Sequence, residues 1–520
     1  LIIGGGINGA VSAASLAGRG ASVALIDRDD FASFTSQESS NLVWGGFKYM
    51  EGYEFRLVRK LCRSRNRLTK AYPDNIKPIP FLAALDDDAP YPPWLAILGA
   101  SAYWGIGGFR THYPRPLSPD RIKAEEPVID VTNVRGGLEY YDAYLPDNDS
   151  RFVFSFVRSA MDVGAAVANY VELVSAEQTG EGWVATLRDV DGHRGEFTCR
   201  AKAIINAAGP FIGDVNAELG PRTDHRIVYS KGIHLIVPKV TDSERVLAFF
   251  DDTGRLFYVI PMGRRSVIGT TDTRVETAYT TVEDEDRDFL LDQINARLAL
   301  EIPLTPDDII SDRCGVRPLV VATDGSDEKD ADWTKLSRKH VIEVDDRRKV
   351  VSIFGGKLTD CLNIGEEVAD AIEGLGLILE PDNELWYGEP AKQTRKAFFR
   401  QADLMKLEDF RAGRDVEPLA DRLWRRYGRR AFEMLDRIVA DPSMGEPIME
   451  NADYLRVELH VAAGTEMITQ LEDFMRRRSK ISQVVPVDQV KGSPGLHEVA
   501  EILFGDDADR RLEEYWERTT

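Results

Sequence analysis

The sequence predicts an α/β fold in three parts: a Rossmann-like dinucleotide-binding unit, a region built on an antiparallel sheet, and a C-terminal helical domain. Three observations support this prediction. A glycine-rich turn follows an apolar strand at the N-terminus, strand patterns joined by a hairpin turn occupy the middle of the chain, and the apolar pattern becomes helical after Pro390. With 520 residues the chain is too long for one ordinary core, so we expect two or three domains.

The N-terminal unit has the order strand, glycine turn, helix, strand and acid. Gly4, Gly6 and Gly9 form a G-x-G-x-x-G pattern around Ile7 and Asn8. Gly4 permits the tight turn, Gly6 lets a pyrophosphate approach the backbone, and Gly9 lets the helix pack closely on the strand. The next strand ends at Asp27, about 18 residues after Gly9, the spacing at which an acid binds a ribose hydroxyl. This order predicts a dinucleotide site.

The middle of the chain contains strand patterns over residues 228–238, 246–261 and 266–270. Asp252-Thr253-Gly254 lies between two apolar segments and predicts a hairpin, so this region is expected to be antiparallel and distinct from the parallel nucleotide-binding sheet. The helical C-terminal part contains arginine-rich runs at 425–430 and 476–478. We expect it to form a separate domain.

Composition excludes several classes of function. A formal net charge of −21 argues against a nucleic-acid partner, which requires clustered lysines and arginines. The cysteines show no C-x-x-C spacing and the histidines no metal-ligand spacing, so we expect neither disulfides nor a metal site. This cysteine usage fits a reducing cytoplasm. The four cysteines are Cys62, Cys199, Cys314 and Cys361.

The most apolar stretch spans residues 94–106 and is shorter than the ~20 residues that a membrane-spanning helix needs. Its pattern favours an ordinary core helix. The alternative is a helix that dips into a membrane interface, because two tryptophans and a tyrosine lie in the stretch.

A hydroxyl-rich loop, residues 30–41, follows the first unit and precedes Trp44-Gly45-Gly46-Phe47-Lys48-Tyr49. From this point the sequence resembles the FAD-dependent glycerol-3-phosphate dehydrogenases, in a series of motifs that keep the family's order over nearly the whole chain. These motifs are Glu54–Val58, Tyr140–Asp142, Asn206–Pro210, Lys231–His234, Ile268–Asp272, Gly315–Leu319, Phe354–Thr359, Tyr454–Glu458 and Asp473–Arg478.

The resemblance implies that the dinucleotide is FAD, bound within the D-amino-acid-oxidase-like architecture. It implies a discontinuous FAD-binding domain over 1–75, 150–225 and 340–378, a substrate domain over 76–149 and 226–339, and a helical domain over 390–520. The residues expected to bind FAD are Gly4, Gly6, Ile7, Asn8, Gly9, Asp27, Arg28, Thr35, Ser36, Ser39, Ser40, Trp44, Gly45, Val171, Ala207, Ala208, Gly209, Gly356, Lys357, Leu358 and Thr359.

The resemblance also implies a substrate site. Arg317 and Arg338 match positions that hold the substrate phosphate, and arginine suits this task because its planar fork donates two parallel hydrogen bonds. His234 matches an active-site position and is the candidate base for the hydroxyl proton. Lys357 is expected near the flavin ring, where negative charge develops on reduction. Lys48 is expected to contact the phosphate and Tyr49 to position the substrate.

The sequence departs from the family pattern at three places near this site. The family's His-Gly-Gly-Leu-Arg-Tyr is here Trp-Gly-Gly-Phe-Lys-Tyr, with Trp44 for histidine and Lys48 for arginine. An indole accepts no proton, and an ammonium lacks the guanidinium fork. Leu362 stands where the family has another arginine. These changes bear on the identity of the substrate.

The predicted function is FAD-dependent oxidation of glycerol 3-phosphate, or a related polyol phosphate, to the 2-keto product, with electrons passed to a quinone or oxygen. One alternative is an oxidase or dehydrogenase of an amine or hydroxy acid, in which Arg317 would bind a carboxylate. Another is a non-catalytic flavin-binding protein, with Trp44 filling the substrate space. We expect a cytoplasmic protein without nucleic-acid partners, and keep peripheral contact with the inner face of the membrane and a homodimer as open alternatives.

Overall fold

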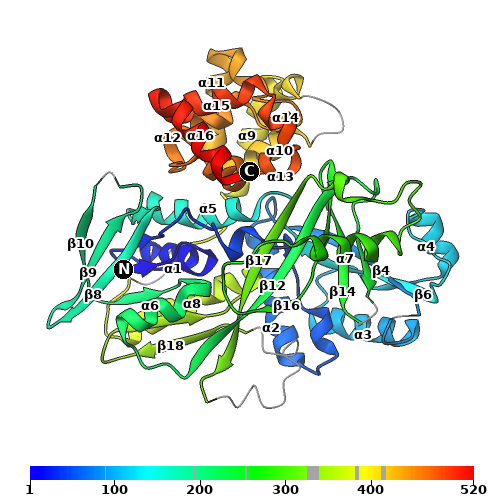
Figure 1. Cartoon of the computed structure of the whole chain (residues 1–520), viewed down its shortest axis with the longest axis horizontal. Coiled ribbons are helices and arrows are strands. Elements are labelled where there is room, and N and C mark those ends of the chain that lie inside the picture. Colours follow the sequence, from blue (N-terminus) through cyan, green and yellow to red (C-terminus); the bar gives the residue numbers. More distant parts are fainter. Residues whose placement is uncertain are drawn as a thin grey trace.

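The computed structural model describes residues 1–87, 89–192, 194–251, 254–324, 339–380, 386–411 and 417–519. Figure 1 shows a broad body that contains the sheets and the N-terminus, with the C-terminal helices packed as a separate mass on one side of it.

The N-terminal strand lies inside a six-stranded sheet of order β18-β19-β11-β1-β2-β7. Neighbouring strands are parallel except β18 and β19, which are antiparallel. Alternate side chains face opposite sides, so Ile2 packs with the helices α1, α5 and α8, and Ile3 packs toward a small sheet on the other face. The elements are β1 (Ile2–Ile3), α1 (Ile7–Gly18), β2 (Ala24–Ile26), α5 (Asp149–Asp162), β7 (Ala166–Ala168), β11 (Ile204–Asn206), β18 (Val341–Asp345), β19 (Val350–Phe354) and α8 (Cys361–Gly374).

The small sheet is three-stranded and antiparallel, in the order β10-β9-β8. Together with α6 it covers the second face of the six-stranded sheet, through a core that includes Trp183 and Leu219. Its elements are β8 (Val171–Thr179), β9 (Gly182–Asp189), β10 (Glu196–Ala201) and α6 (Ile212–Leu219).

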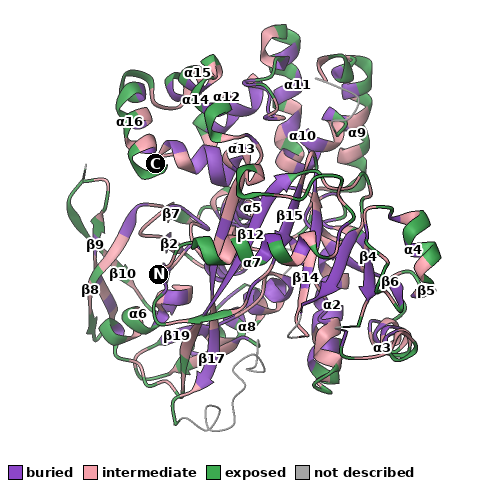
Figure 2. Cartoon of the chain, turned by 45° about the vertical axis from the view of Figure 1, so that its right-hand side comes forward, coloured by how far each residue is buried: buried purple, intermediate pink, exposed green. Residues whose placement is uncertain are grey.

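A ten-stranded sheet forms the other half of the body, in the order β16-β12-β15-β14-β13-β4-β6-β3, with β17 paired to β12 and β5 to β6. The buried strands in its centre are visible in Figure 2. The strands are β3 (Leu42–Val43), β4 (Lys77–Leu85), β5 (Arg115–Leu117), β6 (Gly136–Tyr144), β12 (His225–Pro238), β13 (Val246–Phe250), β14 (Leu256–Met262), β15 (Arg265–Gly269), β16 (Thr273–Val275) and β17 (Ser311–Ala322).

The predicted hairpin is confirmed, because β13 and β14 pair antiparallel and Phe250 lies opposite Leu256. Asp252 and Thr253 of its turn lie outside the described residues. The expectation of a wholly antiparallel sheet is wrong at one place: β4 and β13 run parallel. These two strands are distant in the chain and no hairpin joins them, so turn geometry does not dictate their direction.

The strands of the six-stranded sheet fall within the ranges predicted for the FAD-binding domain, although β3, also in that range, pairs with β6 of the ten-stranded sheet. The exact domain boundaries stay a prediction. The remaining helices of the body are η1 (Thr35–Gln37), η2 (Phe47–Met50), α2 (Phe55–Ala71), α3 (Pro93–Ile106), α4 (Pro119–Glu125), η3 (Gly209–Phe211), α7 (Asp284–Asn295), η4 (Pro306–Asp308) and η6 (Leu358–Asp360).

Helix α3 corrects the expectation of a core helix for residues 94–106. Trp94 and Leu98 are 68% and 60% exposed, and the buried residues of α3 are only Ala96, Ala100 and Tyr103. The sequence pattern failed here because a helix that is apolar on all sides gives no indication of which side is covered. In the described residues we find no helix with the length and apolar character required to cross a bilayer.

The described residues of the C-terminal domain form helices joined by turns and irregular segments, with one isolated bridge and no strand. Two apolar clusters form its interior, one around Trp424 and one around Phe474. Its helices are α9 (Lys392–Leu404), η7 (Leu407–Phe410), α10 (Leu419–Tyr427), η8 (Gly428–Arg430), α11 (Ala431–Ala440), η9 (Pro442–Gly445), α12 (Arg456–Thr465), the π-helix η10 (Asp473–Arg478), α13 (Ile481–Val484), α14 (Val487–Lys491), α15 (Pro494–Phe504), η11 (Gly505–Asp507) and α16 (Ala508–Thr519).

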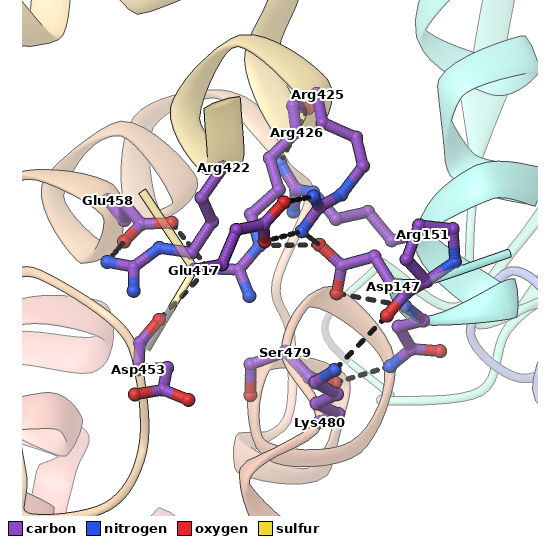
Figure 3. Close-up of polar contacts among 12 residues, drawn as sticks. Asp147, Arg151, Glu417, Arg422, Arg425, Arg426, Asp453, Glu458, Ser479 and Lys480 are labelled. Atoms are coloured by element: carbon purple, nitrogen blue, oxygen red, sulfur yellow. Dashed lines mark hydrogen bonds and ion pairs between the residues drawn. The ribbon is translucent and has the colours of Figure 1, made fainter. Parts of the chain in front are cut away.

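Buried ion pairs join this domain to the body (Figure 3). Asp147 accepts hydrogen bonds from Arg426 at 2.7 Å and Arg425 at 3.3 Å, and Arg426 also reaches Glu458 at 2.8 Å. Burial alone would raise the pKa of Asp147, but the two guanidinium groups hold it well below its usual range. Because a buried charge that loses its partner typically costs about 3–5 kcal/mol, these pairs fix how the domain docks.

Candidate active site

Two of the three N-terminal glycines, Gly4 and Gly9, pack so closely on the backbone that side chains are excluded. Gly4 has a φ of +100°, and a Cβ atom there would lie 2.6 Å from the carbonyl oxygen of Ala207. A Cβ on Gly9 would lie 1.8 Å from the carbonyl oxygen of Gly4. Gly6 is the N-cap of α1 and provides no side-chain cap, and the first turn contains no acidic residue. The N-terminus of α1 is therefore available to an anionic group.

A cavity of about 290 Å³ opens at this turn. It is bounded by the glycine turn, the end of β2, the hydroxyl-rich loop, the start of β8, the segment after β11, and Gly355-Gly356. The predicted cofactor residues that line it are Gly4, Gly6, Ile7, Asn8, Asp27, Arg28, Thr35, Ser36, Val171, Ala207, Ala208, Gly209 and Gly356. Segments that are far apart in the sequence therefore meet at one cavity.

Asp27 lines this cavity at the end of β2. Its carboxylate accepts hydrogen bonds from the backbone N–H groups of Gly5 at 2.6 Å and Asp29 at 3.0 Å. Burial raises the pKa of Asp27 to about 7. A carboxyl group with that pKa can accept a hydrogen bond from a ribose hydroxyl at physiological pH, and the backbone bonds hold its orientation.

Asn8 links the glycine turn to the Gly355-Gly356 motif. Its Nδ2 donates to the carbonyl oxygen of Gly355 at 2.8 Å, while its buried Oδ1 has no hydrogen-bond partner in the described structure. A Cβ on Gly356 would lie 3.0 Å from that Oδ1. A buried acceptor without a partner beside the cavity fits a bound ligand that donates a hydrogen bond.

Beyond the cavity lining, Lys357, Tyr49 and Trp44 form a cluster. The Lys357 ammonium donates to the Tyr49 hydroxyl and lies 4.2 Å from the centre of its ring. The ring of Trp44 is tilted against Tyr49 at 5.7 Å. Lys48 lies in the same short helix, η2, near Glu51: burial raises the pKa of Glu51 and the Lys48 ammonium opposes that shift.

The Asp142 carboxylate fixes the turn at Gly45 by hydrogen bonds. The backbone N–H of Gly45 donates to both carboxylate oxygens of Asp142, which also accepts from Arg65 at 2.8 Å and Tyr103 at 2.7 Å. A Cβ on Gly45 would lie 2.1 Å from the Tyr103 hydroxyl. This buried network fixes the path of the chain just before Lys48 and Tyr49.

Arg317 lies on β17 opposite Ser230 of β12. Its guanidinium donates to the Thr270 hydroxyl at 2.8 Å and lies 3.4 Å from the carboxylate of Asp272. A Cβ on Gly232 would lie 2.1 Å from Nη2 of Arg317, so the missing side chain of Gly232 makes room for the guanidinium. The arginine is partly exposed and can bind an anion.

His234 lies two residues after Gly232 on the same face of β12, opposite Gly269 of β15 and Arg313 of β17. It is 2% exposed, and neither ring nitrogen has a hydrogen-bond partner among the described residues. Burial lowers the pKa of His234 well below its ordinary value, and Arg313 and Arg317 lower it further. The imidazole is therefore neutral at physiological pH.

Other predicted residues lie outside the cavity lining. Ser39 is engaged within the protein: its N–H donates to Asp149 at 3.0 Å and its carbonyl oxygen accepts from Arg313 at 2.6 Å. Arg338 lies outside the described residues. The predicted cofactor residues that are not part of the cavity lining are Gly9, Ser39, Ser40, Trp44, Gly45, Lys357, Leu358 and Thr359.

Sequence reasoning missed two groups of residues. Phe34 and Phe211 line the cavity with their rings 4.8 Å apart, and Arg28 lies 3.9 Å from the ring centre of Phe211. Both aromatics are close in sequence to predicted residues, which is the signal that could have found them. Arg313 was also missed: alternation along β17 places it on the same face as Arg317.

Comparison with known proteins agrees with this geometry. Residues 1–358 match the family described as FAD dependent oxidoreductase, and residues 403–510 match the C-terminal domain of alpha-glycerophosphate oxidase. The glycerol-3-phosphate dehydrogenase 2 of Mycobacterium tuberculosis is 31% identical, over 100% of this chain and 87% of the relative. The D-erythritol 1-phosphate dehydrogenase of Brucella abortus is also 31% identical, over 92% of this chain and 93% of the relative.

Solved structures share the fold. The glycerol-3-phosphate dehydrogenase from Bacillus halodurans, complexed with FAD, superposes with a TM-score of 0.72 at 22% identity, covering 99% of this chain and 92% of the other. The L-alpha-glycerophosphate oxidase from Mycoplasma pneumoniae gives a TM-score of 0.56 at 16% identity, with 75% and 97% covered.

The glycine turn, the cavity and these matches define an FAD-dependent oxidoreductase. The unpartnered Asn8 Oδ1 and the glycines that admit no Cβ are the features of this chain that fit the cofactor. The chain belongs to the FAD-dependent glycerol-3-phosphate dehydrogenase family.

Proposed function

We propose that the protein oxidises glycerol 3-phosphate or a related polyol phosphate at its secondary hydroxyl and forms the 2-keto product. One observation supports this most: a guanidinium, Arg317, and a buried neutral imidazole, His234, share one face of the β12–β17 pair. Pro318, the next residue of β17, lines the cofactor cavity, so this strand runs beside the cofactor site. When bound, FAD would supply the acceptor for the hydride of the carbon that carries the hydroxyl.

In this proposal Arg317 holds the phosphate. Its fork donates parallel hydrogen bonds to two phosphate oxygens, and the missing side chain of Gly232 leaves room for the guanidinium. Asp272 and Thr270 hold the guanidinium in place before the substrate binds. Lys48 and Arg338 are proposed as further phosphate contacts on the strength of the family resemblance.

His234 takes the hydroxyl proton as the hydride leaves. Two properties support this role: its ring nitrogens have no partner in the described structure, and burial keeps the ring neutral. Proton transfer to a positioned base typically contributes about 10²–10⁴-fold to the rate. Lys357 places a positive charge beside the cofactor, and its contact with Tyr49 orients the tyrosine hydroxyl toward the substrate.

The substrate is a three- or four-carbon polyol phosphate. The relatives at 31% identity include enzymes named for glycerol 3-phosphate and one named for D-erythritol 1-phosphate. Trp44 and Lys48 replace the histidine and arginine of the family pattern, and Trp44 packs against Tyr49 of the proposed site. These replacements bear on how long a polyol the site accepts.

Anaerobic mixing of the FAD-loaded enzyme with a substrate panel tests the proposal. Glycerol 3-phosphate or erythritol 1-phosphate is expected to bleach the flavin absorbance rapidly, glycerol only slowly and at high concentration, and glycine and lactate not at all. Bleaching by glycine or lactate would instead identify an amine or hydroxy-acid oxidase. A flavin that stays oxidised with every compound would favour a non-catalytic flavoprotein.

We further propose that α2 and α3 contact a membrane surface, which would place the enzyme near a quinone acceptor. The two helices pack side by side, joined by a hydrogen bond from Arg65 to Tyr103 (Figure 2). Helix α2 has no acidic residue and exposes four basic side chains, Arg56, Arg59, Arg63 and Lys70, in a chain of net charge −21. Large apolar side chains are exposed on α3 and nearby, namely Tyr53, Phe55, Trp94, Leu95, Leu98, Phe109 and Tyr113. Apolar residues beside a basic helix suit an anionic bilayer.

Co-sedimentation with anionic vesicles tests this contact. The double variant Trp94→Ser with Leu98→Ser is expected to bind about tenfold more weakly, because each side chain contributes up to about 1.5–3 kcal/mol when fully buried. The control, Leu404→Ser with Val439→Ser, alters exposed apolar residues of the C-terminal domain and is expected to bind normally. Equal binding by both double variants would contradict the assignment.

A further inference from the structure

Three consecutive arginines of the C-terminal domain, Arg476, Arg477 and Arg478, are all buried at the contact with the body. They end the π-helix η10, a rare geometry that often occurs at functional sites. Asn148 of the body fixes this segment further, because its Nδ2 donates to the carbonyl oxygens of Arg476 and Ser479.

The three guanidinium groups bind one segment of the body, the loop over residues 30–41. Arg478 donates two hydrogen bonds of 2.8 Å to the two carboxylate oxygens of Asp30, and Arg477 adds a third at 2.7 Å. Arg476 donates to the carbonyl oxygen of Gln37 at 2.7 Å and to Glu38 at 3.1 Å. The loop is therefore held at its start and near its end.

The same loop forms a wall of the cofactor cavity. Thr35 and Ser36 line the cavity, and the Ser36 hydroxyl accepts a hydrogen bond from the backbone N–H of Ile7 in the glycine turn. Thr35 donates to the carbonyl oxygen of Val316, beside Arg317. The segment between the points held by Arg476 and Arg478 thus touches both the dinucleotide turn and the proposed substrate strand.

Buried ion pairs hold the loop over residues 30–41 against the C-terminal domain. Asp30 is fully buried, and although burial raises its pKa, Arg478 and Arg477 outweigh that effect and keep it below its ordinary value. Ion pairs of this kind release the loop only at the cost of an uncompensated buried charge. A loop fixed before the ligand arrives spares the binding step the entropy of ordering it.

We propose that the C-terminal domain is part of the cofactor site: Arg476, Arg477 and Arg478 are positioning residues that set the affinity for FAD by holding residues 30–41 in the binding conformation. The domain then retains the cofactor as well as packing against the body.

Flavin binding by the apoprotein tests this proposal. Arg476→Gln removes the hydrogen bonds of Arg476 to the Gln37 carbonyl and to Glu38, but leaves Arg477 and Arg478 on Asp30. It is expected to raise the Kd for FAD about tenfold, mainly through faster release, and to increase backbone hydrogen exchange in residues 30–41. Arg476→Lys, which keeps the charge and one donor, is expected to recover part of the affinity; if Arg476→Gln does not fold, this milder variant is measured in its place and is expected to raise the Kd about threefold.

Arg422→Gln is the matched control. Arg422 is also buried and pairs with Glu458 inside the C-terminal domain, where Arg426 still holds that carboxylate. The control is expected to lower the melting temperature of the apoprotein about as much as Arg476→Gln does. It is expected to leave the Kd for FAD within twofold of the wild-type value. Normal FAD affinity in both Arg476 variants, or an equal loss in Arg422→Gln, would overturn the proposal.

Discussion

The glycine turn over residues 4–9 and the backbone it packs against, here called the cofactor cradle, differ from the β12–β17 face in which atoms make the decisive contacts. In the cradle the decisive contacts come from backbone atoms, because Gly4 and Gly9 approach neighbouring carbonyl groups more closely than any side chain permits. On the β12–β17 face, side chains decide: Arg317 lies over Gly232, and His234 lies beside Gly269. The first region depends on close backbone packing, within the turn and against Ala207, whereas the second depends on the register of strands distant in sequence.

The largest expected effect is on the side-chain region. His234→Gln is expected to lower kcat by about 10³-fold while FAD binding stays normal, because it removes the proposed base without altering the cradle. His225→Gln, on the same strand but paired with Glu343, is the control and should keep full activity. A His234→Gln enzyme with near-normal kcat would show that the proton leaves by another route.

The same histidine predicts a dependence of stability on pH. Its folded pKa lies well below the ordinary value of 6.5, so the unfolded chain binds the proton more readily. This contribution to stability is fully present above about pH 6.5 and is lost as the pH falls, by up to about 1.4 kcal/mol per pH unit for one group. Denaturant unfolding of wild type and His234→Gln between pH 7 and 5 should therefore show the shallower slope in the variant, and identical slopes would contradict a buried neutral histidine.

The backbone region is tested by Gly9→Ala. The new Cβ would lie 1.8 Å from the carbonyl oxygen of Gly4, so the turn must shift. FAD affinity is expected to fall at least about 100-fold, or about 2.7 kcal/mol. Gly213→Ala is the control: Gly213 lies in α6 with open space around its Cβ position, and alanine there should stabilise the helix by up to about 1 kcal/mol. Equilibrium titration with FAD distinguishes the two variants, and a Gly9→Ala protein that binds FAD normally would refute the steric argument.

A smaller effect is expected from the residues that depart from the family pattern, and it bears on which substrate the enzyme prefers. Trp44→His with Lys48→Arg restores the family pattern and is expected to raise kcat/KM for glycerol 3-phosphate by ~10- to 100-fold, or about 1.4–2.7 kcal/mol. Each single change should give less than the pair if both groups contact one ligand. If wild type is already efficient with glycerol 3-phosphate and the double variant is slower, other residues compensate for Trp44 and Lys48.

The sequence predicted the cradle well because its constraints are local. The order of strand, glycines, helix and Asp27 is set within 27 residues, and every one of these elements is present in the structure. The parallel pairing of β4 and β13 and the exposure of Trp94 were not predicted, because both depend on what other segments cover.

In the candidate site too, local motifs could be predicted from the sequence, whereas contacts between distant segments could not. Arg317 was identified from a motif, but its neighbours Gly232 and Thr270 come from other strands, and only the register brings them together. Arg313 gave no local signal. The attachment of the loop over residues 30–41 by Arg476–Arg478 joins segments more than 400 residues apart, and no periodicity or spacing encodes such a contact.

The most direct test of the account is whether Arg317 recognises the phosphate. Anaerobic single-turnover reduction of the flavin is measured for wild type and Arg317→Gln, with glycerol 3-phosphate and with glycerol at high concentration. Because hydrogen bonds to charged groups contribute about 1.5–3 kcal/mol each, the variant is expected to lose at least about 100-fold in efficiency with glycerol 3-phosphate. Its slow reaction with glycerol should be unchanged. An unaltered rate with glycerol 3-phosphate, or an equal loss with both compounds, would contradict the assignment of this face as the phosphate-binding substrate site.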